Sequence, residues 1–337
     1  MMRAAELSAP HTDLTLVDRD IPTPGPGEIL VKMIACGMCN SEVTLVNGEY
    51  PFARFPTIPG HEVTGTVVAL GEGVAWPEVG DTVGAQFLYD SDMRCDYCAR
   101  GEQILCPNKR ITGIVTDGGY AEYAIFREGF VTPLPQELDP VAGAPLMCAG
   151  LTAFNGLKKA GVTSGSRVAV IGAGAIGGMA IKFAVAMGAR VAVLGRSHRS
   201  EDRAKELGAE RFIATSEGDP AAELKSWGFG ADLIINSTPS TETASAMLGG
   251  LAPDGTLVLL GYGPQPLELP SQLMILNRLH TMASPSGSPK DTRATVDFAV
   301  QHDLMPDITA ISLDEAPATL SEMVGGRWHG GRAVITF

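Results

Sequence analysis

The sequence predicts an α/β chain with two domains, a β-rich first part to about residue 150 and a doubly wound parallel sheet after it. Three observations support this prediction. Short β-branched runs separated by Gly and Pro fill the first part, strand and helix patterns alternate from about 150 to 285, and a glycine motif joins one of these strands to its helix. A length of 337 residues suits two domains.

The first part contains three clear strand patterns, EILVKMIAC (28–36), EVTGTVVAL (62–70) and DTVGAQFL (81–88). Turn signals such as PTPGPGE and PEVGD separate them. Several short strands spaced by turns are typical of a partly barrel-like all-β domain.

After residue 150 the pattern changes to alternating helices and strands. A helix is expected from residue 151 to Gly161, where glycine ends it. The expected strands are 166–174, 190–195, 231–237 and 255–261, and the expected helices are 175–188, 200–208 and 241–251. The last part holds one helical pattern at 290–302 and a closing strand pattern, GRAVITF.

Composition excludes several classes of protein. The net charge is −13, from 25 basic and 38 acidic residues, and no Lys/Arg-rich run occurs, so we expect no nucleic-acid partner. No apolar segment reaches the ~18 residues that a membrane span needs. MMRAAELSAP lacks the apolar region of a signal peptide. We therefore expect a cytoplasmic protein without a membrane partner, in which clustered cysteines bind metal rather than form disulfides.

The glycine motif runs from Gly172 through Ala175 and Ile176 to Gly177, between an expected strand and an expected helix. In that setting GxGxxG predicts a dinucleotide site: Gly172 allows a tight turn, Gly174 lets the backbone approach a pyrophosphate, and Gly177 packs helix against strand. The helix N-terminus offers free N–H groups to the anion.

The next expected strand ends at Gly195, where an NAD site usually has an acidic residue that binds the ribose 2′-OH. Gly195 leaves room there, and Arg196, Ser197 and Arg199 offer positive charge and a donor to a 2′-phosphate. We therefore expect NADP(H) as the preferred cofactor. Gly261, at the end of the strand 255–261, is a further candidate cofactor contact.

Asp92, Cys95, Cys98 and Cys106 lie in one stretch, SDMRCDYCARGEQILC, at steps of three, three and eight. Taken alone, these residues fit a metal site with one carboxylate ligand, an empty degenerate site or three unrelated thiols. Cys36 and Cys39 form a second CxxC, but no thioredoxin-like pattern follows it.

Several motifs together resemble the zinc-dependent medium-chain alcohol dehydrogenases. They are CGMCNSE (36–42), PGHEVTGTVVALG (59–71), APLMCAGLTAF (144–154), the cysteine stretch, GDTVG, GGYAEY, the glycine motif and the closing GRAVITF. They follow one another in the family's order and cover essentially the whole chain. The resemblance implies a GroES-like catalytic domain, residues 1–149 with 286–337 returning to it, and a Rossmann NADP-binding domain, residues 150–285.

The resemblance also implies two zinc sites per chain. The catalytic zinc would be held by Cys39, His61 and Cys148, with Glu62 as a carboxylate that binds it transiently. Two Cys and one His are the catalytic zinc ligands of alcohol dehydrogenase, and they leave a fourth position open for water or substrate oxygen. The structural zinc would be held by Asp92, Cys95, Cys98 and Cys106, with aspartate in place of the family's first cysteine. The oxygen ligand should hold zinc less tightly than sulfur, but the three cysteines retained at the full spacing favour a filled lobe over an empty one.

Further roles follow from the resemblance. Ser41 would relay the alcohol proton, Glu42 would orient His61 in place of the usual Asp, and Thr152 would contact the nicotinamide. Thr44 stands where many members have a His, so the proton would leave through water. Leu88 lies where the family often has apolar pocket residues, and Asn40 where it often has a basic residue near the pyrophosphate.

The resulting expectation is a zinc-dependent, NADP(H)-preferring alcohol dehydrogenase or aldehyde reductase that acts on a small alcohol or aldehyde and forms a homodimer or homotetramer. Two alternatives remain open at the level of sequence: a zinc-free enoyl or quinone reductase with the same fold, and a non-catalytic NADPH-binding protein. The retained cysteines and Ser41 argue against both.

Overall fold

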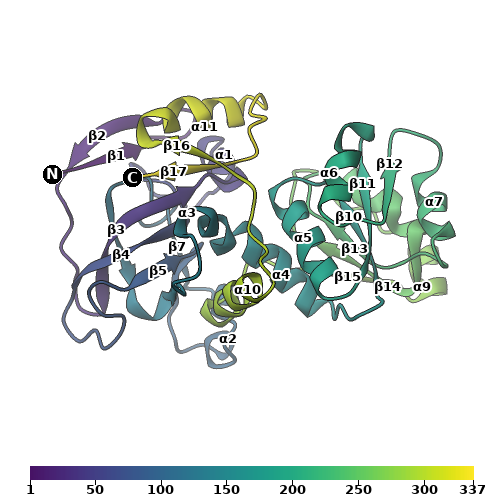
Figure 1. Cartoon of the computed structure of the whole chain (residues 1–337), viewed down its shortest axis with the longest axis horizontal. Coiled ribbons are helices and arrows are strands. Elements are labelled where there is room, and N and C mark those ends of the chain that lie inside the picture. The colour runs from purple at the N-terminus through teal and green to yellow at the C-terminus, as the bar shows by residue number, and fades with distance from the viewer. The chain divides into compact units, whose positions relative to one another are not determined.

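The computed structural model describes all 337 residues. They divide into two compact units, residues 1–151 with 287–337 and residues 152–286 (Figure 1). Compared with the ranges expected from the sequence, the first unit extends to Leu151 rather than residue 149, and the chain returns to it at Gly287 rather than residue 286.

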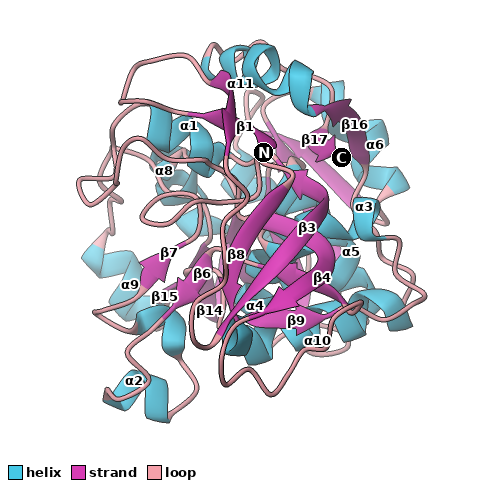
Figure 2. Ribbon diagram, turned by 90° about the vertical axis from the view of Figure 1, so that its left-hand side faces the viewer, coloured by secondary structure: helices cyan, strands magenta, loops and turns pink.

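A seven-stranded mixed sheet forms the centre of the first unit. In spatial order it contains β16 (Ile308–Ser312), β17 (Arg332–Thr336), β3 (Glu28–Gly37), β4 (Glu62–Leu70), β5 (Thr82–Ala85) and β9 (Val131–Pro133), with β8 (Tyr123–Arg127) also paired to β3. Only β16 and β17 run parallel to each other. Figure 2 shows β8, β3 and β4 side by side.

Strand β3 connects the parts of this sheet. One edge pairs with β4, while the other pairs first with β8 and then, at Ala35–Gly37, with β17. Its apolar residues Ile29, Val31 and Met33 belong to the core of the unit. Because β17 pairs with the end of β3, the last strand of the chain lies beside the segment that leads into Cys39.

The strand expected at 81–88 is in fact two strands. β5 ends at Ala85, and β6 (Leu88–Asp90) pairs with β7 (Arg110–Ile111) in a separate sheet. Between them, the carbonyl of Gln86 accepts the Thr112 hydroxyl at 2.8 Å. This break directs the chain out of the large sheet and into residues 91–109, which we call the cysteine lobe.

The remaining elements of the first unit surround the sheet. They are β1 (Met2–Glu6) paired with β2 (Thr15–Arg19), the helices α1 (Asn40–Val46), α2 (Asp96–Ala99), α3 (Pro140–Gly143), α10 (Pro289–Gln301) and α11 (Ala316–Val324), and the 3₁₀ turns η1 (Gln103–Leu105), η2 (Glu128–Phe130), η3 (Ala144–Met147) and η6 (Leu313–Glu315). The helix expected at 290–302 and the closing strand are α10 and β17. Sequence patterns had not indicated β1, β2 or α11.

The second unit is built on a six-stranded sheet in which every pair is parallel. Its spatial order is β12 (Arg211–Ala214), β11 (Arg190–Gly195), β10 (Arg167–Ile171), β13 (Ala231–Asn236), β14 (Leu251–Leu259) and β15 (His280–Ala283). From the central pair β10 and β13, the chain adds β11 and β12 on one side and β14 and β15 on the other. Doubly wound sheets bind ligands at such a switch point, outside the carboxyl ends of the strands.

Helices cover both faces of this sheet (Figure 1). They are α4 (Ala149–Lys159), α5 (Ala175–Ala186), α6 (Glu201–Glu206), α7 (Pro220–Ser226), α8 (Thr241–Ala246) and α9 (Ser271–Asn277), with the 3₁₀ turns η4 (His198–Ser200) and η5 (Met247–Gly250). The helix expected at 241–251 ends at Ala246, since the two glycines at 249 and 250 disfavour helix. No helix of either unit is both long and apolar enough to cross a membrane.

Candidate active site

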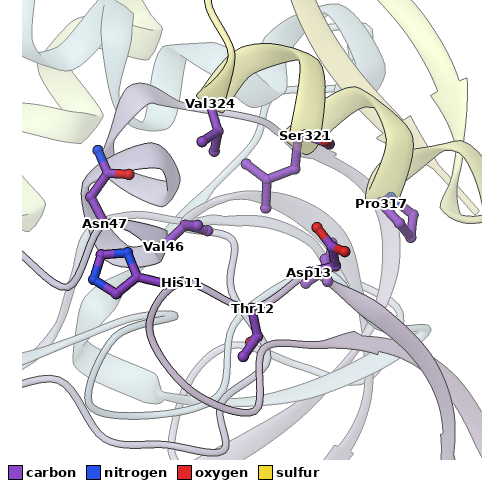
Figure 3. A pocket seen from close by; sticks show the side chains of 10 residues that line it. His11, Thr12, Asp13, Val46, Asn47, Pro317, Ser321 and Val324 are labelled. Atoms are coloured by element: carbon purple, nitrogen blue, oxygen red, sulfur yellow. The ribbon is translucent and has the colours of Figure 1, made fainter.

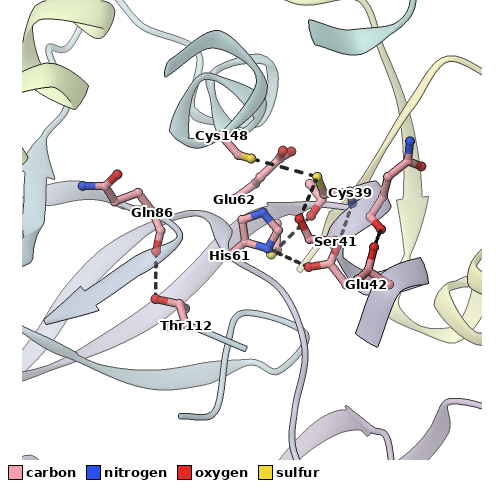
Figure 4. A network of polar contacts seen from close by, with 12 residues as sticks. Cys39, Ser41, Glu42, His61, Glu62, Gln86, Thr112 and Cys148 are labelled. Carbon is pink, nitrogen blue, oxygen red and sulfur yellow. Dashed lines mark hydrogen bonds and ion pairs between the residues drawn. The ribbon is translucent and has the colours of Figure 1, made fainter. Parts of the chain in front are cut away.

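Helix α1 begins at the first of the predicted ligand residues. Cys39 is its N-cap, and the Cys39 backbone N–H donates to Glu42 Oε2 at 2.6 Å (Figure 4). Together with a bond from the third helical N–H to the Cys39 side chain, this closes a capping box. Cysteine is not a usual N-cap residue, so Glu42 stabilises the start of the helix and fixes the backbone of Cys39.

His61 lies just before β4 and is fully buried. Its Nδ1 is 2.7 Å from Glu42 Oε1, so the two oxygens of Glu42 contact His61 and Cys39 at once. The second ring nitrogen, Nε2, is buried and has no hydrogen-bond partner. A buried polar atom without a partner is costly, and a metal ion bound to Nε2 would satisfy it.

Cys148 follows η3 and completes the cluster. Its Sγ is 4.0 Å from that of Cys39, and the ligand atoms of Cys39, His61, Glu62 and Cys148 all lie within 4.8 Å of one another. Every one of these four residues is buried. The structure therefore brings together four residues from three separate segments, the first and last of which, Cys39 and Cys148, are 109 positions apart in the sequence.

The charges of the metal-free cluster favour a thiolate. The Cys148 thiol, hydrogen-bonded to Cys39, is the main reason that the pKa of Cys39 lies well below its usual range. Burial opposes charge on His61, but Glu42 and Cys39 together outweigh it and raise the pKa of His61 to about 10. Two soft sulfur atoms, one imidazole and a carboxylate are a donor set that suits zinc.

Glu62 has a partner that the sequence analysis did not identify. Arg332 of β17 forms a bidentate ion pair with its carboxylate, with Nε 3.0 Å from Oε2; Glu62 is fully buried and the Arg332 side chain is 9% exposed. A Cβ at Gly37 would overlap Glu62 Oε2, so glycine is needed there. The motif GRAVITF contained this arginine, but only the pairing of β17 with β3 reveals its partner.

The other residues predicted near this cluster differ in their surroundings. Ser41 Oγ is 3.7 Å from Cys39 Sγ, and the Thr44 hydroxyl donates to the carbonyl of Asn40 at 3.2 Å. The prediction for Leu88 is wrong, because Leu88 is packed in a small core cluster with Ile104 and Phe130. Its neighbour Phe87 instead meets the His61 ring edge-on, with centroids 5.1 Å apart.

The cysteine lobe gathers the second predicted set. The ligand atoms of Asp92, Cys95, Cys98 and Cys106 lie within 4.8 Å of one another, with Cys98 and Cys106 buried and the other two half-buried. Cys95 Sγ is 3.5 Å from Cys98 Sγ, and Cys98 Sγ is 3.4 Å from Asp92 Oδ1. This set also suits a tetrahedral metal.

Hydrogen bonds keep the Asp92 carboxylate ionised. Its Oδ1 accepts the backbone N–H groups of Arg94 and Cys95 at 2.9 and 3.0 Å, and its Oδ2 accepts the Asn108 amide at 2.8 Å. The Arg94 bond is the largest of the causes that hold the pKa of Asp92 well below its usual range. By contrast, burial raises the pKa of the Cys98 thiol to about 11.

In the second unit, the glycine motif forms the turn from β10 into α5. Gly172 has φ +87°, which only glycine adopts readily, and a Cβ at Gly177 would overlap the Gly172 carbonyl. Gly174, the N-cap of α5, has no atom within 4 Å of its Cβ position and no side-chain cap. The open space and free N–H groups of this helix suit a pyrophosphate.

The other predicted cofactor residues lie in the same unit. Thr152 is buried in the first turn of α4, and Gly261 follows β14, where a Cβ would come within 2.5 Å of the Thr238 carbonyl. After β11, Arg196 and Arg199 are exposed and Ser197 is half-buried. Gly195 does not leave empty space, contrary to the sequence-based expectation, because Phe212 and Ser200 occupy it.

A separate cavity of about 270 Å³ lies in the first unit (Figure 3). It is lined by residues 11–14, the end of α1 at Val46 and Asn47, and one face of α11. It contains no cysteine and none of the predicted site residues, so it offers no donor set for the chemistry of the cysteine clusters.

Comparison with known proteins identifies relatives along the whole chain. Residues 25–136 match the alcohol dehydrogenase GroES-like domain, and residues 175–301 match the zinc-binding dehydrogenase domain. An alcohol dehydrogenase of Geobacillus stearothermophilus is 33% identical over 330 residues, which is 98% of this chain and 97% of that protein.

Solved structures agree with these matches. CAD from Helicobacter pylori complexed with NADP(H) has a TM-score of 0.87 and 26% identity over 99% of this chain and 97% of that one. Acetophenone reductase from Geotrichum candidum in complex with NAD has a TM-score of 0.89 and 26% identity over 100% and 97%. With its GroES-like and Rossmann units, the chain belongs to the zinc-dependent medium-chain dehydrogenase/reductase family, the family of the alcohol dehydrogenases.

Proposed function

We propose that this protein is a zinc-dependent alcohol dehydrogenase or aldehyde reductase that prefers NADP(H). It would transfer hydride between the nicotinamide ring and the carbon of an alcohol or carbonyl group. The observation that carries the proposal is the buried cluster of Cys39, His61 and Cys148, in which His61 Nε2 has no partner. A zinc ion held there acts as a Lewis acid on the substrate oxygen.

The residues around the cluster would position the ligands and move the proton. Glu42 holds the His61 ring and the Cys39 backbone in place through its two oxygens. Ser41, beside Cys39 Sγ, would accept the alcohol proton and pass it on to water. Glu62, whose carboxylate lies beside the other ligand atoms and is paired with Arg332, would be the transient fourth ligand of the zinc.

For the cofactor, the Gly172–Gly177 turn supports a dinucleotide, and the region after β11 supports NADP(H). Arg196 and Arg199 are exposed, Ser197 adds a donor, and no acidic side chain ends β11. Thr152 and Gly261 are proposed as further cofactor contacts. Replacing Arg196 with Asp should weaken NADPH binding by ~10-fold or more, since a charge-assisted hydrogen bond is lost; unchanged affinity would contradict its phosphate role.

We also propose that the cysteine lobe binds a second, structural zinc through Asp92, Cys95, Cys98 and Cys106. Three thiols and one carboxylate complete a closed tetrahedral set without an open position. The ionised state of Asp92, maintained by three hydrogen bonds, supplies the negative ligand that the missing cysteine would otherwise provide.

We further propose a homodimer, or a homotetramer built from it, through the exposed edge of the six-stranded sheet. β15 is the edge strand, and Ile275 and Leu276 of the adjacent α9 are 77% and 75% exposed. An unpaired sheet edge beside a helix with exposed apolar side chains favours pairing with a second copy. Light scattering should find monomers for Ile275→Glu/Leu276→Glu but not for Phe229→Glu, which alters an exposed aromatic residue elsewhere in the same unit.

The proposed activity is tested by assaying purified protein on a panel of primary and secondary alcohols and aldehydes with NADPH and with NADH. We expect turnover of at least one pair and a higher kcat/KM with NADPH. Reduction of activated alkenes or quinones by zinc-free protein would instead identify the protein as a zinc-free enoyl or quinone reductase. Tight NADPH binding without turnover on any substrate would indicate a non-catalytic NADPH-binding protein.

A further inference from the structure

The space above Gly195 is filled by side chains from two other elements. A Cβ built on Gly195 would lie 2.6 Å from Cζ of Phe212, 3.0 Å from its Cε2 and 2.7 Å from the Ser200 hydroxyl oxygen. Carbon atoms do not approach ordinary neighbours this closely. Gly195 is not among the residues with positive φ, so its backbone alone does not require glycine. Instead, the crowding by Phe212 and Ser200 is the reason that glycine is required at position 195.

The sheet register explains why Phe212 reaches Gly195. β12 pairs in parallel with β11, and Phe212 is opposite Val193. Since side chains alternate between faces, Val193, Gly195 and Phe212 share one face of the sheet. The absent side chain of Gly195 leaves the space into which the Phe212 ring extends.

The Phe212 ring also contacts the turn that follows β11. His198, in the 3₁₀ turn after β11, lies against Phe212 with ring centroids 5.8 Å apart. His198 is in turn held by Glu201, 2.6 Å from its Nδ1, and by Glu217, 3.6 Å from its Nε2. Glu201 raises the pKa of His198, which strengthens these contacts. The contact with His198 favours the position of the Phe212 ring beside Gly195.

We propose that Phe212 and Ser200 are specificity-determining residues that exclude an acidic side chain from position 195. The inference rests on the proposed NADP(H) preference and adds a second cause to it. Arg196, Ser197 and Arg199 favour a 2′-phosphate by charge, whereas Phe212 and Ser200 deny space to the carboxylate that would bind a ribose 2′-OH. Exchanging Gly195 for Asp alone therefore does not create an NAD site.

The test compares Gly195→Asp in two backgrounds, the wild type and Ser200→Ala/Phe212→Leu. The double substitution removes the hydroxyl oxygen and the outer ring atoms but keeps an apolar side chain on β12. Dissociation constants for NADPH and NADH are measured by fluorescence titration of the zinc-loaded protein. We expect Gly195→Asp alone to weaken NADPH binding without improving NADH binding.

In the Ser200→Ala/Phe212→Leu background, Gly195→Asp should bind NADH ~10-fold or more tightly than the single Gly195→Asp variant, the gain expected of about one carboxylate–hydroxyl pair. Equal NADH affinity in both backgrounds would overturn the inference. The wild-type ratio of the two dissociation constants tests the NADP(H) preference itself, and the comparison between backgrounds does not depend on it.

A second measurement needs no cofactor and remains informative if Gly195→Asp does not fold. Gly195→Ala should lower the Tm of the wild type clearly more than the Tm of Ser200→Ala/Phe212→Leu, because contact between the residues makes their effects non-additive. Equal losses of Tm in the two backgrounds would contradict the crowding.

Discussion

The two cysteine clusters of the first unit differ in how the chain builds them. The cysteine lobe draws Asp92, Cys95, Cys98 and Cys106 from one short segment and leaves two of them half-buried. The other cluster draws Cys39, His61 and Cys148 from three separate segments and buries all of them. A local, partly exposed set suits a structural role, whereas a buried set with an unpaired imidazole nitrogen suits chemistry.

The two clusters also differ in which side chains carry charge. In the buried cluster the pKa of Cys39 is lowered and that of His61 is raised, so the surroundings favour negative charge on Cys39 and positive charge on His61. In the lobe the charge resides on Asp92, while the pKa of Cys98 is raised. Zinc must displace a proton from Cys98 in the lobe and from His61 in the buried cluster, so metal binding to either set weakens as the pH falls.

The largest expected effect comes from Cys39→Ser. Loss of a ligand thiolate should remove one zinc per chain and lower kcat/KM by ~1,000-fold or more, since Lewis-acid stabilisation is worth several kcal/mol. Cys36→Ala is the matched control, because Cys36 lies three residues earlier in the core and outside the cluster. Full activity of Cys39→Ser, measured beside this control, would refute the catalytic zinc assignment.

A smaller effect is expected for Glu42→Gln. The amide has the size of the carboxylate but lacks its charge, so it should hold His61 less firmly and reduce zinc affinity in the buried cluster by ~10- to 100-fold. Competition with a zinc-binding dye measures this. Glu49→Gln, in the exposed segment after α1, should leave the affinity unchanged. If both variants bind zinc like the wild type, Glu42 only caps α1.

The smallest effect concerns the lobe. Asp92→Cys restores a fourth thiolate, a softer ligand, and should slow zinc release to a chelator by a factor of roughly 3 to 10. Asp96→Cys adds a cysteine to the same lobe at an exposed position of α2 and should not slow it. Faster release from Asp92→Cys would mean that the backbone hydrogen bonds of Asp92 matter more than ligand softness.

The lobe also shows what sequence alone could predict. Its spacing of three, three and eight is local, so the residues could be grouped by counting, and the glycine motif between a strand and a helix was equally local. Cys39, His61 and Cys148 could be grouped only by resemblance to a family, because no spacing rule connects them.

Long-range packing explains what was missed. Arg332 reaches Glu62 only because β17 pairs with the end of β3. Leu88 was expected in a pocket, but the break between β5 and β6 directs it into the core and leaves Phe87 beside His61. Gly195 was expected to leave room, and only the register of β12 shows that Phe212 fills it.

Zinc content tests the central claim most directly. Elemental analysis of protein purified without a chelator should find two zinc ions per chain in the wild type and one in Cys39→Ser, the remaining ion belonging to the lobe. A wild type without zinc would contradict the assignment of a zinc-dependent dehydrogenase. One ion in the wild type and none in Cys39→Ser would contradict metal binding by the lobe.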